Sequence, residues 1–295
     1  MNSKDFSFVI LHYLAIDDTI ECIESILRLY SNYNMHIVIV DNASPDKSGY
    51  RLKEKYEDNN YIDILLLDKN LGFSKGNNKG INFVNKNYNS DFIIVANNDT
   101  VFIQNNFLKV IFDEYENSNF SVLGPLVEDP DHLNNSNPLY IGKEKELIDL
   151  KKTYNMWKKQ YIKSKLYIDA LHPFKAFNKN SAENNDVRLP TLTQRVENIE
   201  LHGCCLVFSK EYFKYYEGFE ELTFMYGEET ILKMNCDAYR LKMVYNPKLK
   251  IFHKEAVSTK IDNRTRKKKI QYYKRMLEAS KVIYLKKKKQ VGEGI

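Results

Sequence analysis

The chain has 295 residues, of which 43% are hydrophobic and 28% charged, a composition typical of a globular protein with one large core or two modest ones. No apolar run approaches the roughly 18 residues of a membrane span, and the start shows no signal-peptide pattern, so we expect a cytoplasmic protein. The formal net charge of +5 is uneven. Residues 260–289 contain thirteen Lys or Arg and two acids, so this tail carries +11 and the remainder −6.

Short apolar runs alternate with amphipathic segments through the first half of the chain. The runs predict strands over residues 6–11, 36–40, 62–67, 92–95 and 121–126, and the segments between them predict helices that include residues 22–30, 52–56, 81–84 and 107–115. Strands and helices in this order predict an α/β fold with a mostly parallel central sheet and helices on both faces. Such folds bind ligands beyond the carboxyl ends of their strands.

Polar, small or turn-forming residues follow three of the predicted strands. They are Asp41, Asn42, Ala43 and Ser44 after the second strand, a stretch that includes Asn70, Gly72, Asn78 and Gly80 after the third, and Asn97, Asn98, Asp99 and Thr100 after the fourth. Asx-turns and a helix cap would explain the first group without a ligand. Backbone N–H groups of the second could hold a phosphate. The oxygen atoms of the third suit a hard cation such as Mg2+, which in turn suits a diphosphate.

Acidic residues and a histidine mark the second half of the chain. Residues 198–208 predict a buried strand, and Glu228 and Glu229 open a predicted helix that ends at Tyr239. Two acids in the first turn of a helix are stabilised by its dipole, so a structural role is the alternative to a catalytic one. His253 directly follows another apolar run, where a lone histidine is more often structural than a ligand.

Taken together, these ordered motifs resemble the inverting, nucleotide-sugar-dependent glycosyltransferases of family 2, whose fold is called GT-A, and especially their bacterial rhamnosyltransferase-like members. The resemblance covers about residues 6–128 and 199–259. It implies a GT-A-like domain over residues 1–260, with a donor half at about 1–128, a helical insertion at about 129–197 and an acceptor and catalytic half at about 198–260, followed by a basic tail at 261–295.

In that family, the segments that match the three strand ends hold the donor. The resemblance implies donor contacts from Tyr13, Asp41, Asn42, Ser44, Asn70, Gly72, Asn78, Asn97 and Asn98. Asp41 matches an acid that typically receives a pyrimidine N–H. Asp99 matches the acid that binds Mg2+ or Mn2+, and His253 resembles a histidine that can complete this metal site. The family motif is often Asp-x-Asp, whereas Asn97 occupies the first position here, which leaves strict metal dependence open.

Residues 224–229 resemble the family's aromatic-Gly-Glu-Asp segment, in which the second acid is the general base. That position is Glu229, one methylene longer than aspartate, and Glu228 stays open as the alternative. A carboxylate suits the role, because a sugar hydroxyl loses its proton easily only as the glycosidic bond forms. Single displacement at the anomeric carbon would invert its configuration.

The insertion contains an apolar stripe that the family motifs do not explain. Leu147, Leu150, Tyr154, Trp157 and Tyr161 recur at steps of three and four, as on one face of a helix. We expect this stripe to pack over the acceptor cleft, with subunit pairing in a homo-oligomer as the alternative. The asparagine-rich residues 176–187 predict a mobile loop.

The basic tail predicts an amphipathic helix. Its apolar side is formed by Ile270, Tyr273, Met276, Leu277, Ile283 and Tyr284. Residues from Lys260 to Lys289 would dock on an anionic membrane surface, at the inner face of the plasma membrane, with shallow insertion of the apolar side. Packing of that side on the protein's own core is the alternative. No second basic patch or base-stacking motif supports nucleic-acid binding.

The expected function is transfer of a sugar from a UDP- or dTDP-linked donor to a hydroxyl of a growing surface glycan or lipid-linked saccharide. Glycine spacing that matches neither a dinucleotide fingerprint nor a P-loop disfavours NAD and ordinary ATPase chemistry. One alternative is a sugar nucleotidyltransferase, although residues 11–16 lack the glycine-rich, basic loop usual there. The other is an inactive sugar-nucleotide-binding subunit, in which Asn97 reflects decay of the metal motif.

Overall fold

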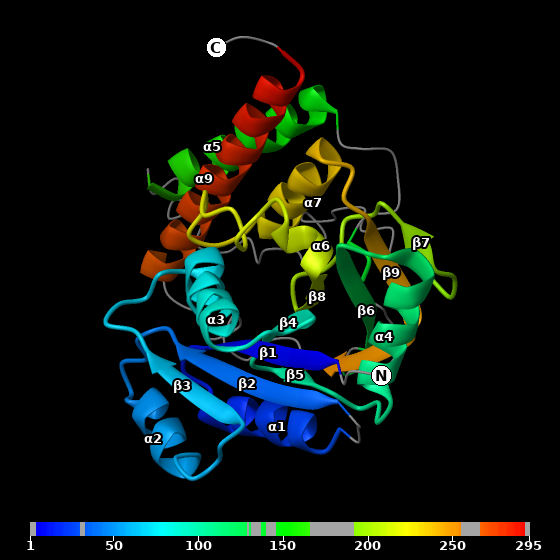
Figure 1. Ribbon diagram of the computed structural model, residues 1–295. Helices are drawn as coiled ribbons and strands as arrows, with labels where there is room; N and C mark the ends of the chain where they lie inside the picture. The colour runs from blue at the N-terminus through cyan, green and yellow to red at the C-terminus, as the bar shows by residue number, and fades with distance from the viewer. Residues whose placement is uncertain are drawn as a thin grey trace.

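The computed structural model describes residues 4–29, 33–128, 130, 137–139, 146–165, 192–254 and 266–292. These residues form one mixed sheet with helices on both faces, and a pair of long helices lies beside it (Figure 1). The strands lie in the order β3-β2-β1-β4-β8-β6-β9-β5, and β7 pairs with β9.

Four parallel strands form the first half of the sheet. They are β1 (Asp5–His12), β2 (Asn34–Asp41), β3 (Ile62–Leu66) and β4 (Phe92–Asn97), connected by α1 (Ile16–Leu27), α2 (Ser48–Lys55) and α3 (Phe73–Asn87). Figure 1 shows α1 and α2 on one face of the sheet and α3 on the other. The predicted α/β architecture is confirmed for this half of the chain.

Both faces of this half are buried, which explains its near-continuous apolar strands. Successive side chains of a strand point to opposite faces. Phe8 and Ile10 of β1 pack in a cluster with Ile23 of α1, whereas Val9 packs in the cluster that contains Ile81 of α3. The sheet is therefore the middle layer of three.

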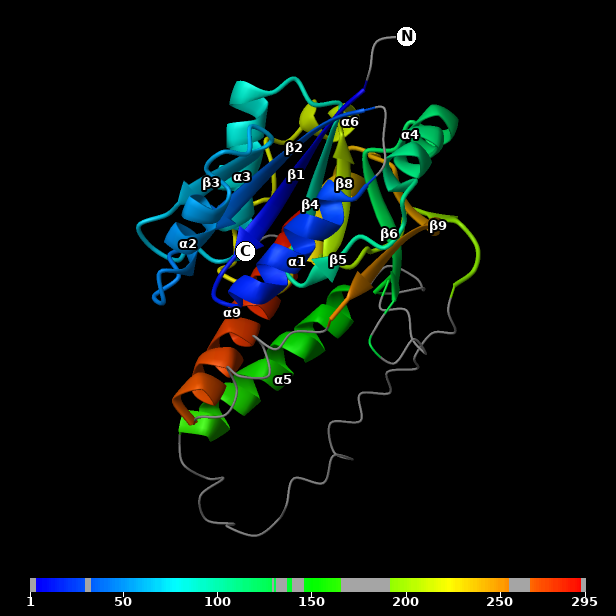
Figure 2. The same cartoon turned by 90° about the horizontal axis from the view of Figure 1, so that it is seen from below.

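The second half of the sheet mixes strand directions. It contains β5 (Thr100–Val101), β6 (Val122–Glu128), β7 (Val196–Glu197), β8 (Cys205–Ser209) and β9 (Met243–His253), with α4 (Phe107–Ser118), α6 (Lys210–Phe213) and α7 (Glu228–Ala238). β8 runs antiparallel between β4 and β6, as Figure 2 shows, and β6 is parallel to β9. Because β8 opposes both of its neighbours, β4 and β6 share a direction and the sheet is mostly parallel.

The prediction of a strand over residues 198–208 is wrong in its first part, since β8 begins at Cys205. The N–H of Cys204 donates to His202 Nδ1 (3.0 Å), and the carbonyl of Cys204 accepts from the N–H of Asn97 (2.9 Å). These bonds replace a regular ladder and place the segment directly at the end of β4.

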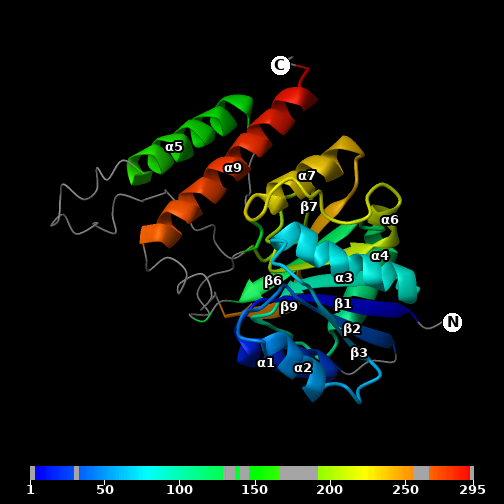
Figure 3. The ribbon, with the colours of Figure 1, turned by 90° about the vertical axis from the view of Figure 1, so that its left-hand side faces the viewer.

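Two long helices pack against each other outside the sheet layers. α5 (Leu147–Lys165) comes from the insertion and α9 (Arg266–Gln290) from the tail, and Figures 1 and 3 show them side by side with α7 between the pair and the sheet. The ring of Tyr154 stacks on that of Tyr284, with centroids 6.1 Å apart, and the ring of Trp157 meets that of Tyr272 edge-on at 6.0 Å.

The two apolar stripes pack on each other and on α7, which for α9 is the alternative of packing within the protein. Leu150 and Ile283 are buried in one cluster with Ile231 and Met234 of α7. The stripe of α5 therefore packs on α9 and α7, and the apolar side of α9 is largely used within the protein; the cover over an acceptor cleft stays a prediction. The reason is that each helix alone leaves an apolar stripe in water, whereas the pair covers both. The predicted loop at 176–187 and residues 260–265 of the tail lie outside the described residues.

Candidate functional site

The strand ends that carry the predicted site residues meet at one edge of the sheet. β1 lies between β2 and β4, and in its register His12 is level with Asp41 while Leu11 is level with Asn97. β2 and β4 therefore end at nearly the same height along β1, one on each side of it. This edge is the carboxyl end of the parallel strands, where the fold predicts a ligand.

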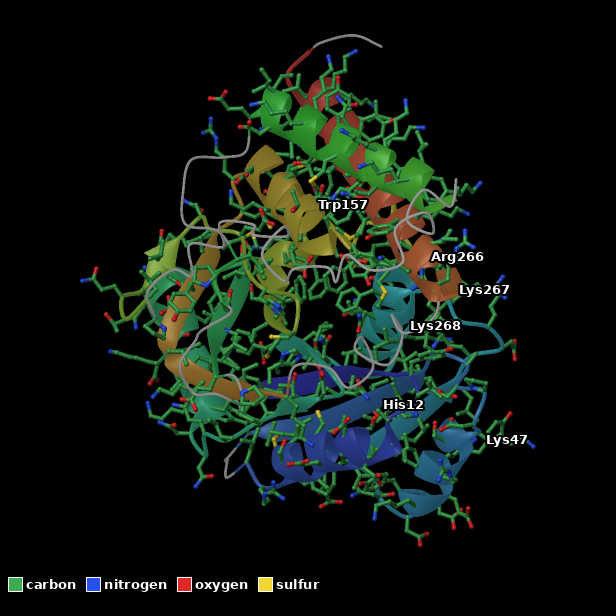
Figure 4. The ribbon with its side chains drawn as sticks, turned by 180° about the vertical axis from the view of Figure 1, so that it is seen from behind. His12, Lys47, Trp157, Arg266, Lys267 and Lys268 are labelled. Atoms are coloured by element: carbon green, nitrogen blue, oxygen red, sulfur yellow. The ribbon has the colours of Figure 1, made fainter. Side chains whose placement is uncertain are left out.

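His12, labelled in Figure 4, is buried and hydrogen-bonded on both sides of its ring. Its Nδ1 lies 2.7 Å from Thr19 Oγ1 and its Nε2 lies 2.8 Å from Ser48 Oγ. Burial lowers the pKa of this imidazole below its ordinary value. A neutral ring in this place donates on one side and accepts on the other, so His12 ties α1 and α2 to the strand end.

A tight turn fixes Asp41 beside the loop that carries Tyr13. Asp41 Oδ1 accepts the N–H of Ser44 (3.1 Å), and Ser44 Oγ accepts the N–H of Leu14 (2.9 Å). A Cβ on Gly49 would stand 2.2 Å from Asp41 Oδ2, so the carboxylate occupies space that only glycine leaves. Asp41 is buried, whereas Tyr13 is 39% exposed at the rim of the edge.

Asn42 joins the second strand end to the glycine-rich loop. Its Nδ2 donates to the carbonyl of Gly72 (3.1 Å), and its Oδ1 accepts the N–H of Leu71 (2.8 Å). Within that loop, Asn70 Oδ1 accepts the N–H of Gly72 (2.9 Å). Asn42 and Asn70 thus shape the loop that leads into α3.

The same loop contacts the acidic segment of the second half. Gly72 has a left-handed backbone (φ 81°), and a Cβ there would stand 2.0 Å from the carbonyl oxygen of Phe224. The N–H of Phe73 donates to that carbonyl (2.9 Å). The two halves of the candidate site are therefore linked by backbone contact, and glycine is required for it.

Asn78 lies within α3, and its side-chain amide hydrogen-bonds the loop around Phe219. Its Nδ2 donates to the carbonyl of Phe219 (2.8 Å) and to Glu221 Oε1 (3.0 Å), and its Oδ1 accepts the N–H of Phe219 (2.8 Å). This side chain holds α3 to the segment before the acidic motif. The donor contact assigned to it stays a prediction.

Asp99 and His253 are brought together although 154 positions separate them. β5 pairs with the end of β9 so that Thr100 is level with His253, and His253 Nε2 lies 3.0 Å from Asp99 Oδ1. Both side chains are buried. Asn98 points another way, since its Nδ2 donates to Thr19 Oγ1 (3.0 Å).

His202 is a neighbour of this pair that the sequence did not assign to the site. Its ring lies 5.9 Å from that of His253, and burial, with the nearby His253, lowers its pKa to about 4. The ring is therefore neutral at physiological pH, and its Nδ1 accepts the N–H of Cys204. Metal-ligand spacing is absent around His202, but its position before a glycine in a buried segment was a usable signal.

The donor atoms at this edge fit a divalent cation in part. Among the described residues, no group of three or more His, Cys, Asp or Glu side chains could hold a metal ion. Asp99 and His253 form a pair, with one carboxylate oxygen and one imidazole nitrogen directed at each other. Mg2+ is usually held by one or two carboxylates together with substrate phosphates and water. These two residues fit an ion that shares its coordination with a diphosphate.

Glu229 lies against the segment that also contacts the end of β4. A Cβ on Gly203 would stand 2.8 Å from Glu229 Oε1, so the carboxylate is next to the bare backbone of that glycine. One residue on, the carbonyl of Cys204 accepts from Thr100 Oγ1 (3.2 Å), directly after Asp99. The candidate base and the candidate metal ligand therefore converge on the same short segment.

Glu228 faces a different environment. It is 7% exposed, and its Oε1 accepts a long hydrogen bond from Thr223 Oγ1 (3.5 Å). Burial, with the charge of Glu229 beside it, raises the pKa of Glu228 to about 7. Of the two acids, Glu229 is thus the one beside Gly203, and Glu228 is the more deeply buried.

The raised pKa of Glu228 predicts that stability falls as pH rises. The folded state holds the proton up to about pH 7, whereas the unfolded state releases it near the ordinary value of 4.5. The resulting loss in the free energy of unfolding is absent below pH 4.5 and grows between the two pKa values. It is complete above pH 7, where it is on the order of 3 kcal/mol.

In urea unfolding, Glu228→Gln should therefore gain stability over the wild type at about pH 8 but not at about pH 4. The exposed control Glu57→Gln should show no such difference, and an equal gain at both pH values would contradict the linkage.

The turn before the two acids has strained backbone and is held by α9. Tyr226 (φ 76°) and Gly227 (φ 84°) are both left-handed, and a Cβ on Gly227 would stand 2.8 Å from Ile283 Cδ1. The guanidinium of Arg275 lies over the ring of Phe224, 4.6 Å from its centroid. α9 therefore supports the loop that presents Glu228 and Glu229.

Comparison with known proteins decides the family. A family model described as glycosyl transferase family 2 matches residues 7–181, more than half of the chain. The chain belongs to glycosyl transferase family 2. The predicted family is thereby confirmed, and the sugar nucleotidyltransferase alternative has no support from this match.

Two curated proteins are similar to parts of this family 2 chain. The dTDP-rhamnosyl transferase RfbF of Shigella flexneri is 24% identical over 131 residues, 44% of this chain and 41% of that protein. The low-salt glycan biosynthesis hexosyltransferase Agl10 of Haloferax volcanii is 29% identical over 125 residues, 42% of this chain and 36% of that protein. The chain thus spans less than half the length of these curated relatives.

Among solved structures, residues 1–349 of TarS from S. aureus superpose with a TM-score of 0.49 at 15% sequence identity, over 85% of this chain and 60% of TarS. A second crystal structure of the same TarS segment, in complex with UDP-GlcNAc, gives the same TM-score and identity.

Proposed function

We propose that this protein is an inverting glycosyltransferase that moves a hexose or deoxyhexose from a UDP- or dTDP-linked donor to a hydroxyl of a growing glycan. The observation that carries the proposal is the convergence of Asp99, His253 and Glu229 on residues 202–204. The names of the two curated relatives, a dTDP-rhamnosyl transferase and a hexosyltransferase, support this donor class. A lipid-linked acceptor would place the reaction at the inner face of the plasma membrane.

The donor nucleoside would lie over the end of β1. Tyr13 is exposed there and offers a ring for stacking on a base, and Asp41 is buried in the adjacent turn that Ser44 closes. An ionised carboxylate only accepts hydrogen bonds, so it suits the ring N–H of uracil or thymine. The loop from Asn70 to Gly72, shaped by Asn42, would lie along the ribose and diphosphate.

Asp99 and His253 would hold a divalent cation together with the diphosphate. When bound, Mg2+ or Mn2+ offsets the charge that develops on the departing nucleoside diphosphate. His202 is neutral in the same place, so it adds no positive charge that would compete with the cation. Asn97 ends β4 and Asn98 follows it; each neutral amide has an NH2 that suits a phosphate and an oxygen that suits a sugar hydroxyl.

Glu229 would remove the proton of the acceptor hydroxyl as the new glycosidic bond forms. In this step, the acceptor oxygen bonds to the anomeric carbon, and the bond from that carbon to the diphosphate oxygen breaks. The proton of the acceptor hydroxyl moves to the carboxylate of Glu229. Attack from the face opposite the leaving group inverts the anomeric centre. The approach of Glu229 to the bare backbone of Gly203 leaves the base beside the segment that lines the donor edge.

Calorimetric titration with UDP, dTDP, GDP and ADP, with and without Mn2+, tests the donor site first. We expect Mn2+-enhanced binding of a pyrimidine diphosphate and weaker binding of both purine diphosphates. Incubation with the matching nucleotide sugar and candidate acceptors, followed by NMR of the product, then tests transfer and its stereochemistry. Absence of pyrimidine binding under every condition would exclude the transferase, and binding without any transfer would favour an inactive sugar-nucleotide-binding subunit.

A further inference from the structure

Positive charge is concentrated on the α5–α9 pair. The two helices together contain seventeen Lys or Arg and two acids, a net charge of +15, while the whole chain carries +5. The remainder of the chain is therefore at −10. Figure 4 labels Arg266, Lys267 and Lys268 at the start of α9, the end of that helix nearer His12 in this view. Such a segregation of charge attracts an anionic partner to this pair.

The outward face of α5 carries apolar side chains among the lysines. Ile148 is 58% exposed, and Met156 and Ile162 are each 45% exposed. At 100° per residue these positions lie on the side of the helix opposite Leu150 and Trp157, which pack inward. The exposed lysines of the same side are Lys151, Lys152, Lys158, Lys159 and Lys163.

This face differs from the one expected to dock on a membrane. The aromatic side of α9 is largely taken up by contacts such as the Tyr154–Tyr284 stack, whereas the outward face of α5 has aliphatic side chains in water and lysines on both sides of them. Among the described residues, no helix is long and apolar enough to cross a bilayer. Helices that lie in the plane of a membrane surface combine basic side chains with apolar ones that enter the headgroup boundary.

We propose that the outward face of α5 is a docking surface for an anionic phospholipid bilayer. Lysines would contact lipid phosphates while Ile148, Met156 and Ile162 enter the boundary between headgroups and acyl chains. The exposed aliphatic side chains favour a bilayer over nucleic acid. Nucleic acid would need only the lysines, together with aromatic rings on which bases stack. α9 contacts both α5 and the loop before Glu228. Docking through α5 would therefore also set the orientation of the candidate site relative to the bilayer.

Vesicle co-sedimentation of the full chain tests this surface without any nucleotide sugar. Vesicles would contain phosphatidylglycerol and phosphatidylcholine at a ratio of roughly 3:7, at about 0.1 M and about 0.5 M NaCl. The triple variant Lys151→Gln, Lys159→Gln and Lys163→Gln should bind about 100-fold more weakly than the wild type. The triple variant Ile148→Gln, Met156→Gln and Ile162→Gln should bind about tenfold more weakly.

The matched control replaces three exposed lysines elsewhere, Lys53, Lys86 and Lys248, with glutamine. It should bind vesicles like the wild type, and all variants should keep the wild-type melting temperature, because the replaced side chains are exposed. Equal loss in the control and the lysine variant would overturn the proposal, as would wild-type binding to pure phosphatidylcholine that salt does not weaken. Binding to a random duplex DNA but not to the vesicles would also overturn it. Nucleotide titration of the same variants reads the donor site separately, so either proposal can fail alone.

Discussion

Replacing Glu229 with glutamine is expected to lower kcat for sugar transfer by about 1,000-fold, since a positioned general base contributes roughly a hundredfold to ten-thousandfold. Glutamine keeps the length of the side chain and its contact with the backbone of Gly203, so the fold and the acceptor site should be retained. Donor affinity, measured by calorimetry on the same variant, should be unchanged. The loss should therefore appear in kcat and not in the binding of the nucleoside diphosphate.

The neighbouring acid provides a matched control. Glu228 has the same chemistry one residue away, but it is buried toward Thr223, and the three atoms nearest a Cβ on Gly203 all belong to Glu229. Glu228→Gln should keep kcat within about threefold of the wild type, because it removes no group that faces the acceptor. If Glu228→Gln abolished transfer while Glu229→Gln did not, the two roles would be exchanged. If neither variant lost activity, this pair would not supply the base.

The strand ends could be predicted because each signal was local. A run such as residues 92–95 is apolar because β4 is buried on both faces, and the change to Asn97, Asn98 and Asp99 marks the point where the strand reaches its edge. Parallel strands bring such points together, so the meeting of Asp41 and Asn97 beside β1 followed from chain order. The start of α7 at Glu228 was equally local, since acids favour the first turn of a helix.

The partners of the two long helices could not be predicted in the same way. The stripe of α5 showed that one face is buried, but an apolar stripe does not specify what covers it. Tyr284 and Tyr272 supply that cover from more than 100 positions farther along the chain. Once α9 occupies the inward side of α5, Ile148 and Ile162 are left in water on the other side, a consequence visible only in the assembled structure.

The roles of the asparagines were also hidden in the sequence. Asn42 and Asn78 have the same side chain, yet the amide of Asn42 holds the glycine-rich loop and that of Asn78 holds the backbone of Phe219 to α3. An amide has both a donor and an acceptor, so it can satisfy a carbonyl and an N–H of another segment at once. Sequence pattern shows that such a residue is near an edge, whereas only the geometry shows whether the backbone or a ligand receives its hydrogen bonds.

Replacing Asp99 with asparagine is expected to abolish most of the Mn2+ enhancement of nucleoside diphosphate binding, a loss of roughly 100-fold in affinity. Asparagine keeps the size of the side chain and an oxygen that can accept from His253 Nε2, so the loop between β4 and β5 should be preserved. What it removes is the negative charge, and Asn97 cannot replace that charge because it is an amide. Calorimetric titration with the pyrimidine diphosphate, with and without Mn2+, measures the difference directly.

Asp113→Asn is the matched control, because Asp113 lies on α4 in an exposed pair with Lys109 and away from the strand edge. It should titrate like the wild type. With Asn97 in place of a first aspartate, Asp99 would be the single carboxylate that the motif after β4 offers to the ion. A cation held by one carboxylate, one histidine and the diphosphate loses its only anionic protein ligand in Asp99→Asn, so affinity without metal should change little. Equal weakening with and without Mn2+ would instead assign Asp99 to direct donor contact, and retained enhancement would move the cation away from this pair.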